Sequence, residues 1–124
     1  MGKVDGMLSG KSMLDLSRAL RDALRGVFGE QVSGFRVLEH ADGDRAWLAY
    51  RFVLYDFSPI VFTYDRGAFG FGEDHGNVVL PVLTSTESAP GLDDLTRLMT
   101  ELDRRVRLRI PDKYLADRGV GTKD

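Results

Sequence analysis

The segment WLAYRFVLYDFSPIVFTYDRGAFGF, residues 47–71, contains nine of the twelve aromatic residues of the chain. The even positions from Ala46 to Leu54 and the odd positions from Trp47 to Tyr55 are both largely apolar. Because successive side chains of an extended strand point to opposite faces, this pattern predicts apolar groups on both faces of a sheet. Helices can cover one face, while the other needs a different cover or stays partly exposed for a partner.

Turn residues divide this part of the chain into short strands. We predict strands at about residues 35–38, 45–57, 60–64, 68–71 and 78–82, separated by the turn signals Asp42-Gly43, Ser58-Pro59 and Asp65-Arg66-Gly67. Pro81 cannot donate a ladder hydrogen bond, which indicates an edge strand or a bulge. Glu73 to Gly76 is expected to form a loop. Strands that follow one another directly predict an antiparallel meander.

Amphipathic segments flank the strands. From Met13 the apolar residues recur at helical spacing, with Ser12 as a predicted N-cap and Gly26 and Gly29 as stop signals. A second helix is expected to start near Pro90 and to end before Pro111, followed by a short helical turn over 112–118. The sequence therefore predicts an α+β fold, an antiparallel meander sheet of four to five strands with an N-terminal and a C-terminal helix packed mainly on one face.

Length and composition limit the classes of protein. The 124 residues predict a single domain over 12–118, with a flexible lead over 1–11 and a flexible tail over 119–124. A net charge of -2 gives no basic signature of a nucleic-acid partner. The chain has no cysteine, which excludes disulfides, thiolate nucleophiles and cysteine zinc sites. No signal peptide or membrane span is recognised, so we expect a cytoplasmic protein without a membrane partner.

Two glycine-containing motifs resemble phosphate loops but lack their context. Gly10-Lys11-Ser12 matches only the end of a Walker loop, because Asp5 stands where its first glycine belongs and no strand precedes it. Gly67, Gly70 and Gly72 have the reversed spacing of a dinucleotide fingerprint and lie within a predicted hairpin. We interpret these three glycines as backbone relief in a twisted strand or bulge.

The ionisable residues do not form a recognisable catalytic pattern. His40 and His75 are the only histidines, and His75 in its acidic loop is interpreted as a surface residue rather than a metal ligand or general base. Asp56 and Asp65 bracket the third strand, where turn hydrogen bonds are favoured over a glycosidase-like pair. The arginines at 104, 105, 107 and 109 fit the negative end of a helix better than a phosphate site. We therefore predict no catalytic, cofactor-binding or metal-binding residues, and no enzyme.

Two segments carry a resemblance to a known group of proteins. They are residues 64–72, YDRGAFGFG, followed by His75-Gly76, and residues 107–115, RLRIPDKYL. Together they resemble small immunity proteins of bacterial polymorphic-toxin and contact-dependent growth inhibition systems. The general layout covers most of the chain, and the motifs specify neither a toxin nor an active site.

The resemblance implies an inhibitor that binds the C-terminal toxin domain of a sibling effector and covers its active site. Many such toxins are nucleases with basic clefts, which acidic loops would complement. The predicted contact surface spans the third to fifth strands and comprises Asp56, Asp65, Arg66, Phe69, Phe71, Glu73, Asp74 and His75. Phe69 and Phe71 share one face, so they are expected to be buried or exposed together. Changing Glu73 and Asp74 together to Lys is expected to weaken binding with little change in folding.

Two other classes stay open at this point. A small-molecule-binding or weakly catalytic α+β domain would show a deep enclosed cavity ringed by Tyr50, Tyr55, Tyr64 and an ionisable group. A homodimeric structural protein would use the exposed sheet face as an isologous interface, and an immunity protein could itself be a monomer or a homodimer. A filled interior with a flat outer face would favour the inhibitor.

Overall fold

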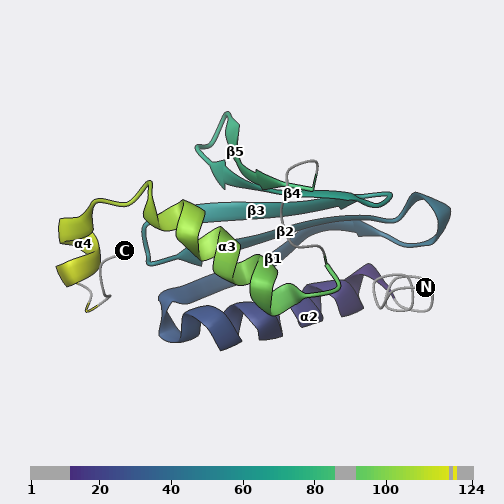
Figure 1. The fold of residues 1–124 in the computed structure, drawn as a ribbon. Coiled ribbons are helices and arrows are strands. Elements are labelled where there is room, and N and C mark those ends of the chain that lie inside the picture. Colours follow the sequence, from purple (N-terminus) through teal and green to yellow (C-terminus); the bar gives the residue numbers. More distant parts are fainter. Residues whose placement is uncertain (1–11, 86–91, 118, 120–124) are drawn as a thin grey trace.

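The structure, a computed structural model, describes residues 12–85, 92–117 and 119. Within these residues a helix is followed by five strands and two further helices (Figure 1). The elements are α2 (Met13–Phe28), η1 (Gly29–Gln31), β1 (Val32–Ala41), η2 (Gly43–Arg45), β2 (Trp47–Leu54), β3 (Ser58–Asp65), β4 (Ala68–Asp74), β5 (Val79–Thr84), α3 (Leu95–Arg107) and α4 (Asp112–Asp117). Except for Gly119, the predicted flexible ends lie outside the described residues.

The five strands form one antiparallel sheet in the order β1-β2-β3-β4-β5, which confirms the predicted meander. Tight turns join the central strands. Tyr55 and Asp56 after β2 have φ angles of 59° and 51°, and Arg66 and Gly67 between β3 and β4 have φ angles of 50° and 99°. Turns of this left-handed type match the right-handed twist of paired strands. They fix the register that runs from β2 through β4.

The ends of β2 and β3 differ from the prediction. β2 ends at Leu54 rather than Phe57, because the next two residues form the left-handed turn. Ser58 and Pro59, which we expected to break the second strand, are the first residues of β3. Proline is tolerated at the start of a strand because few ladder bonds are lost there.

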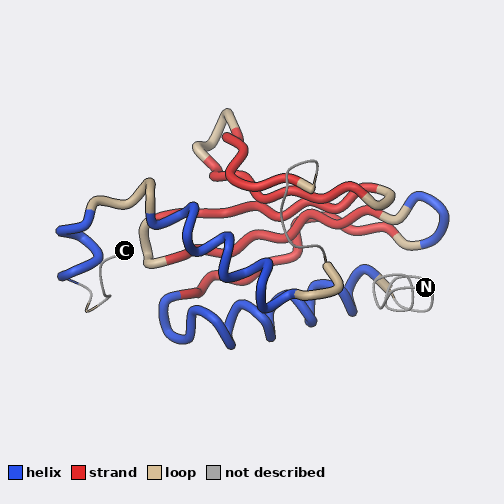
Figure 2. The backbone as a smooth tube through the Cα atoms, viewed as in Figure 1, coloured by secondary structure: helices blue, strands red, loops and turns tan. Residues whose placement is uncertain are grey.

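Both helices pack on the same face of the sheet, as predicted (Figure 1, Figure 2). Side chains that face the helices are 0–6% exposed on β2 and β3; they are Leu48, Tyr50, Phe52, Leu54, Ile60, Phe62 and Tyr64. Their partners on the helices are almost fully buried; they are Met13, Leu16, Leu20, Leu24, Leu98, Met99, Leu102 and Val106. Each such side chain stabilises the fold by about 1.5–3 kcal/mol.

The first helix has the ends that the sequence predicted. Ser12 and Asp15 form a capping box, in which each side chain accepts a hydrogen bond of 3.2 Å from the other residue's amide. The Met13 amide donates to Asp42 Oδ1 at 2.7 Å, which joins the helix start to the end of β1. Gly29, with a φ of 58°, is the C-cap. These contacts satisfy amides that a helix end otherwise leaves unpaired.

The second long helix begins at Leu95 and not near Pro90, which lies outside the described residues. Asp94 Oδ1 accepts from the Arg97 amide at 3.2 Å, so the helix starts directly after this N-cap. The predicted short turn after Pro111 is α4, whose Leu115 is fully buried. No helix among the described residues is long and apolar enough to cross a membrane.

Candidate protein-binding surface

One face of the sheet is not covered by a described helix, and we call it the open face (Figure 2). By strand register its residues include Trp47, Ala49, Arg51 and Val53 of β2, Pro59, Val61, Thr63 and Asp65 of β3, Gly70, Gly72 and Asp74 of β4, and Val79, Pro81 and Thr84 of β5. On β3 the burial alternates along the strand, with buried residues toward the helices and half-buried ones on the open face. The expectation of apolar residues on both faces is therefore confirmed.

Two glycines of β4 create a groove on the open face. Gly70 and Gly72 project no side chain between β3 and β5, so a hollow of about 250 Å³ remains there. Its walls are Val61, Thr63, Val79, Pro81 and Thr84. Because the floor is glycine and the walls are mostly apolar, the groove can receive an apolar side chain from another molecule.

Exposed apolar side chains extend this groove toward the start of β5. Val78 and Val79 are each 52% exposed, and Leu80 is 43% exposed. Val79 belongs to the groove wall, whereas Leu80 pairs with Glu73 and lies on the other side of β5. Contiguous exposed apolar surface is uncommon in monomeric proteins and marks sites that another molecule covers. We call the groove, with the exposed Val79 side chain in its wall, the β4–β5 patch.

The backbone of β5 is less available than its side chains for contact with another molecule. Pro81 has no amide hydrogen, and its carbonyl oxygen accepts a hydrogen bond of 3.0 Å from Arg109 Nη2. The carbonyl of Val82 accepts one of 3.1 Å from Arg105 Nη1. The register shift at Val82 is a bulge, so the predicted edge strand with an irregularity is confirmed. A partner would therefore dock on side chains rather than add a sixth strand at this position.

The predicted contact residue Glu73 belongs to the interior. It is 8% exposed and lies in β4, not in a loop, because the residues after Phe71 continue to pair with β5. The Ser58 hydroxyl donates to Glu73 Oε2 at 2.7 Å, and His75 Nε2 and Arg109 Nη1 lie 3.0 and 3.5 Å from Oε1. Burial raises the pKa of the Glu73 carboxyl. The hydrogen bonds and nearby positive charges lower this pKa by more, so the net shift is downward. Lysine at this position would disturb folding, so that part of the expectation is wrong.

Phe69 and Phe71 share the helix-facing side of β4, opposite the glycine groove. Phe71 is 1% exposed, with its ring 5.0 Å from that of Phe62, while Phe69 is half-buried and packs against the same core. The expectation that the two share a face is confirmed. Phe71 cannot contact a partner in this fold, since helices cover its face.

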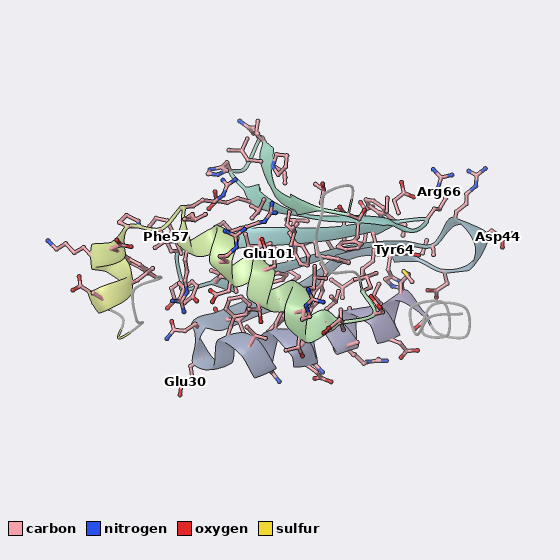
Figure 3. All side chains as sticks on the ribbon, in the orientation of Figure 1. Glu30, Asp44, Phe57, Tyr64, Arg66 and Glu101 are labelled. Atoms are coloured by element: carbon pink, nitrogen blue, oxygen red, sulfur yellow. The ribbon has the colours of Figure 1, made fainter. Side chains whose placement is uncertain are left out.

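Asp56 lies at the opposite end of the sheet from Asp65 and Arg66. Figure 3 shows the neighbouring Phe57 and Arg66 at the two ends of the molecule. Since β3 has 8 residues, the two aspartates are separated by about 25 Å. They cannot form a catalytic carboxylate pair, which needs a separation of about 5–10 Å. Asp65 and Arg66 are exposed and form an ion pair of 3.1 Å at the far end of the open face.

Asp74 and His75 lie at the rim of the β4–β5 patch. Asp74 Oδ2 is 3.4 Å from Arg51 Nε, an ion pair that crosses β3 on the open face. Asp74 Oδ1 also accepts a hydrogen bond of 2.9 Å from the Gly76 amide, and this bond and the nearby Arg51 lower its pKa. The His75 side chain is 49% exposed. These two residues thus lie close to the patch.

The four arginines near the end of α3 are engaged in internal contacts. Arg105 and Arg109 donate to carbonyl groups of β5. In addition, Arg104 and Arg105 pair with Glu101 at 2.6 and 2.8 Å, and Arg107 pairs with Asp103 at 3.0 Å. This agrees with interpreting them as a helix end rather than as a phosphate site.

The interior formed by the described residues is packed with buried side chains. Tyr50, Tyr55 and Tyr64 are 3%, 2% and 6% exposed and pack in the core, where the Tyr55 hydroxyl donates to Asp103. The hollows found among the described residues are open grooves at the surface. In the same part of the chain, no cluster of three or more His, Cys, Asp or Glu residues could hold a metal ion. By the criterion set from the sequence, a filled interior favours a binding surface over an enclosed ligand pocket.

The sequence interpretation missed the apolar residues of the patch. We read the glycines of residues 67–72 only as backbone relief and the residues from Val78 to Val82 only as a strand. The signal was present, because Gly70 and Gly72 alternate with Phe69 and Phe71 and must lie on the opposite face. Comparison of the chain with protein-family models, curated proteins and solved structures gave no match.

Proposed function

We propose that this protein is an immunity protein, which binds a bacterial toxin domain one to one and blocks it by covering its surface. The observation that carries the proposal is the β4–β5 patch, an exposed apolar surface with a groove at its centre. The resemblance of residues 64–72 and 107–115 to immunity proteins supports the same class. This mechanism needs no chemistry from the inhibitor, only a rigid surface that fits its target.

The architecture suits such a surface. The patch lies on β3, β4 and β5, whose opposite face is fixed by the aromatic core, so little order has to be gained on binding. An apolar side chain of the toxin would fill the groove between Val61 and Val79. Charged groups at the rim, Asp74 with Arg51 and the exposed His75, would orient the partner.

The proposed partner is the C-terminal domain of a sibling toxin, and the proposed location is the cytoplasm, where a cell would need protection from its own effector. The absence of cysteine is compatible with a reducing compartment. The proposal does not specify the activity of the toxin. A nuclease with a basic cleft would fit acidic side chains at the rim better than the arginines there.

Co-expression with the toxin domain encoded beside this chain tests the proposal. The chain is expected to restore growth and to co-purify with the toxin as a complex of equal stoichiometry. Val79→Glu places a charge in the groove wall at a side chain that is 52% exposed, so the free protein should stay folded. We expect affinity to fall at least about tenfold, equivalent to about 1.4 kcal/mol, because the new charge would be buried in the complex.

Leu38→Glu is the matched control. Leu38 is 40% exposed on β1, at the opposite edge of the sheet, and its replacement should leave affinity unchanged. Failure of the unmodified chain to restore growth or bind would refute the function. Rescue that is insensitive to Val79→Glu but lost with Leu38→Glu would keep the function and move the interface to β1. A dimer in solution that dissociates only with Val79→Glu would instead assign the patch to self-association.

A further inference from the structure

A second groove lies between α2 and β1, apart from the β4–β5 patch. It encloses about 250 Å³ and is lined by arginines over an apolar floor. The arginines are Arg18, Arg21 and Arg36, and the floor includes Phe35 and Tyr50. The whole chain carries a net charge of -2, so the arginines of α2 at one hollow are a local reversal of the overall charge.

The sequence builds the arginine side of the groove from helical spacing. Arg18, Arg21 and Arg25 follow one another at intervals of three and four residues, which places them along one side of α2. Arg36 comes from β1, where register shifts on either side of it indicate bulges. Bulges change the direction of strand side chains and occur next to binding sites. Arg36 pairs with Arg51 of the open face, so the positive charge that faces the hollow comes from the arginines of α2.

The floor of the groove is aromatic and rigid. The rings of Phe35 and Tyr50 are stacked, with centroids 6.2 Å apart and an interplanar angle of 23°. The guanidinium of Arg25 lies over the Phe35 ring at 5.2 Å. Tyr50 is 3% exposed, so its ring is held by the core. A flat apolar group could pack along this floor.

The charges of the groove are only partly compensated. Arg18 pairs with Asp15 at 2.9 Å, whereas Arg21 and Arg36 have no carboxylate within ion-pairing distance among the described residues. Arg21 Nε is buried and has no hydrogen-bond partner in that part of the chain. A buried donor without an acceptor is unfavourable, so an acceptor supplied there by a ligand would be favourable.

The pKa of the Tyr50 hydroxyl also reflects the positive charge of these arginines. Burial raises its pKa, while the positive charges of Arg21 and Arg25 act in the opposite direction and Asp22 adds a smaller increase. Both guanidiniums therefore lie near this hydroxyl, and the acidic groups close by on α2 are Asp15 and Asp22.

We propose that the groove between α2 and β1 binds a small organic oxyanion, a carboxylate or phosphate carried on a flat apolar body. The anionic oxygens would accept from the guanidiniums of Arg18 and Arg21, whose planar forks suit both groups. The apolar body would rest on Phe35. The volume is slightly below the range of about 300–1,000 Å³ of typical ligand pockets, so the ligand is small. This site is independent of the proposed toxin interface.

Titration of the full chain with four probes tests the site. The probes are benzoate, phenyl phosphate, the neutral analogue benzamide and inorganic phosphate, followed by calorimetry and by the NMR signal of the Arg21 Nε–H group. We expect benzoate or phenyl phosphate to bind at least tenfold more tightly than benzamide and inorganic phosphate, and to shift the Arg21 signal. Arg21→Gln should lose the binding, whereas Arg45→Gln, which removes an exposed arginine outside the groove, should keep it.

Each other result would overturn the proposal in a specific way. Equal binding of benzamide would show that the arginines do not recognise charge. Equal binding of inorganic phosphate would show that the aromatic floor adds nothing. No heat and no shift at millimolar concentrations of both organic anions would exclude the site, provided that the thermal unfolding of the unmodified chain confirms a folded protein.

Discussion

Alanine in place of Gly72 tests how closely β5 packs on β4 at the floor of the groove. A Cβ atom at Gly72 would lie 2.3 Å from Val79 Cγ1 and 3.3 Å from the Leu80 carbonyl oxygen. The Val79 side chain would have to move, and overpacking of this kind costs about 1–3 kcal/mol. Replacing glycine also restricts the unfolded chain, which offsets about 0.4–1 kcal/mol of that destabilisation. We expect Gly72→Ala to lower the free energy of unfolding by about 1 kcal/mol.

Gly70→Ala is the matched control on the same strand and face. There a Cβ atom would meet the Leu83 carbonyl oxygen at 3.5 Å and Thr84 Cγ2 at 3.6 Å, which are ordinary contacts. The φ of Gly70 is not positive, so alanine adopts its backbone without strain. We expect this change to raise the free energy of unfolding by about 0.5 kcal/mol.

Urea denaturation followed by circular dichroism measures both variants. For a slope of about 1–3 kcal/mol per molar urea, a loss of about 1 kcal/mol moves the midpoint down by about 0.3–1 M. The midpoint of Gly70→Ala should stay equal or rise slightly. Equal midpoints for both variants, or a higher one for Gly72→Ala, would refute the close packing of Val79 over Gly72.

Three further predictions concern the charged and polar groups. Glu73→Gln should lower the free energy of unfolding by about 1–3 kcal/mol, because the buried carboxylate that Ser58 donates to is lost; chemical denaturation would measure it. Hydrogen bonds from Arg104 and, to a smaller extent, Arg105 lower the pKa of Glu101 from 4.5 to about 2. The stabilisation from these bonds is therefore present above pH 4.5 and is lost as the pH falls toward 2. Glu101→Gln should remove this pH dependence from the denaturation midpoints. Burial and, to a smaller extent, the hydrogen bond to Asp103 raise the pKa of Tyr55 to about 12. The stabilisation from the protonated Tyr55 hydroxyl is therefore present below pH 10.0 and is lost as the pH rises toward 12. The phenolate absorbance that disappears in Tyr55→Phe would identify the titration of this residue.

Local sequence signals located most helices and strands. Ser12 and Asp15 predicted the start of α2 because a capping box depends only on residues three positions apart. Asp65-Arg66-Gly67 predicted the turn after β3 for a similar local reason, and its left-handed residues are present. The second long helix was placed too early because Pro90 suits a first helical turn, whereas in the structure the Asp94 side chain caps a helix that begins at Leu95.

The candidate site was harder to predict because it depends on which face of the sheet the helices cover. The period of two placed Phe69 and Phe71 on one face and Gly70 and Gly72 on the other, but it did not say which face was buried. We assigned the aromatic face to the partner, whereas Phe71 lies in the core. Glu73 was misplaced for a related reason, since the ion pair with Arg109 joins β4 to the end of α3 across many intervening residues.

Methyl NMR of the chain, recorded with and without the toxin domain encoded beside it, tests the central claim most directly. The account predicts a complex of equal stoichiometry in which the methyl signals of Val61 and Val79 shift or broaden most. The signals of Leu38 and Leu108, exposed outside the patch, should stay in place. Perturbation centred on Leu38 or Leu108, or the absence of any complex, would contradict it.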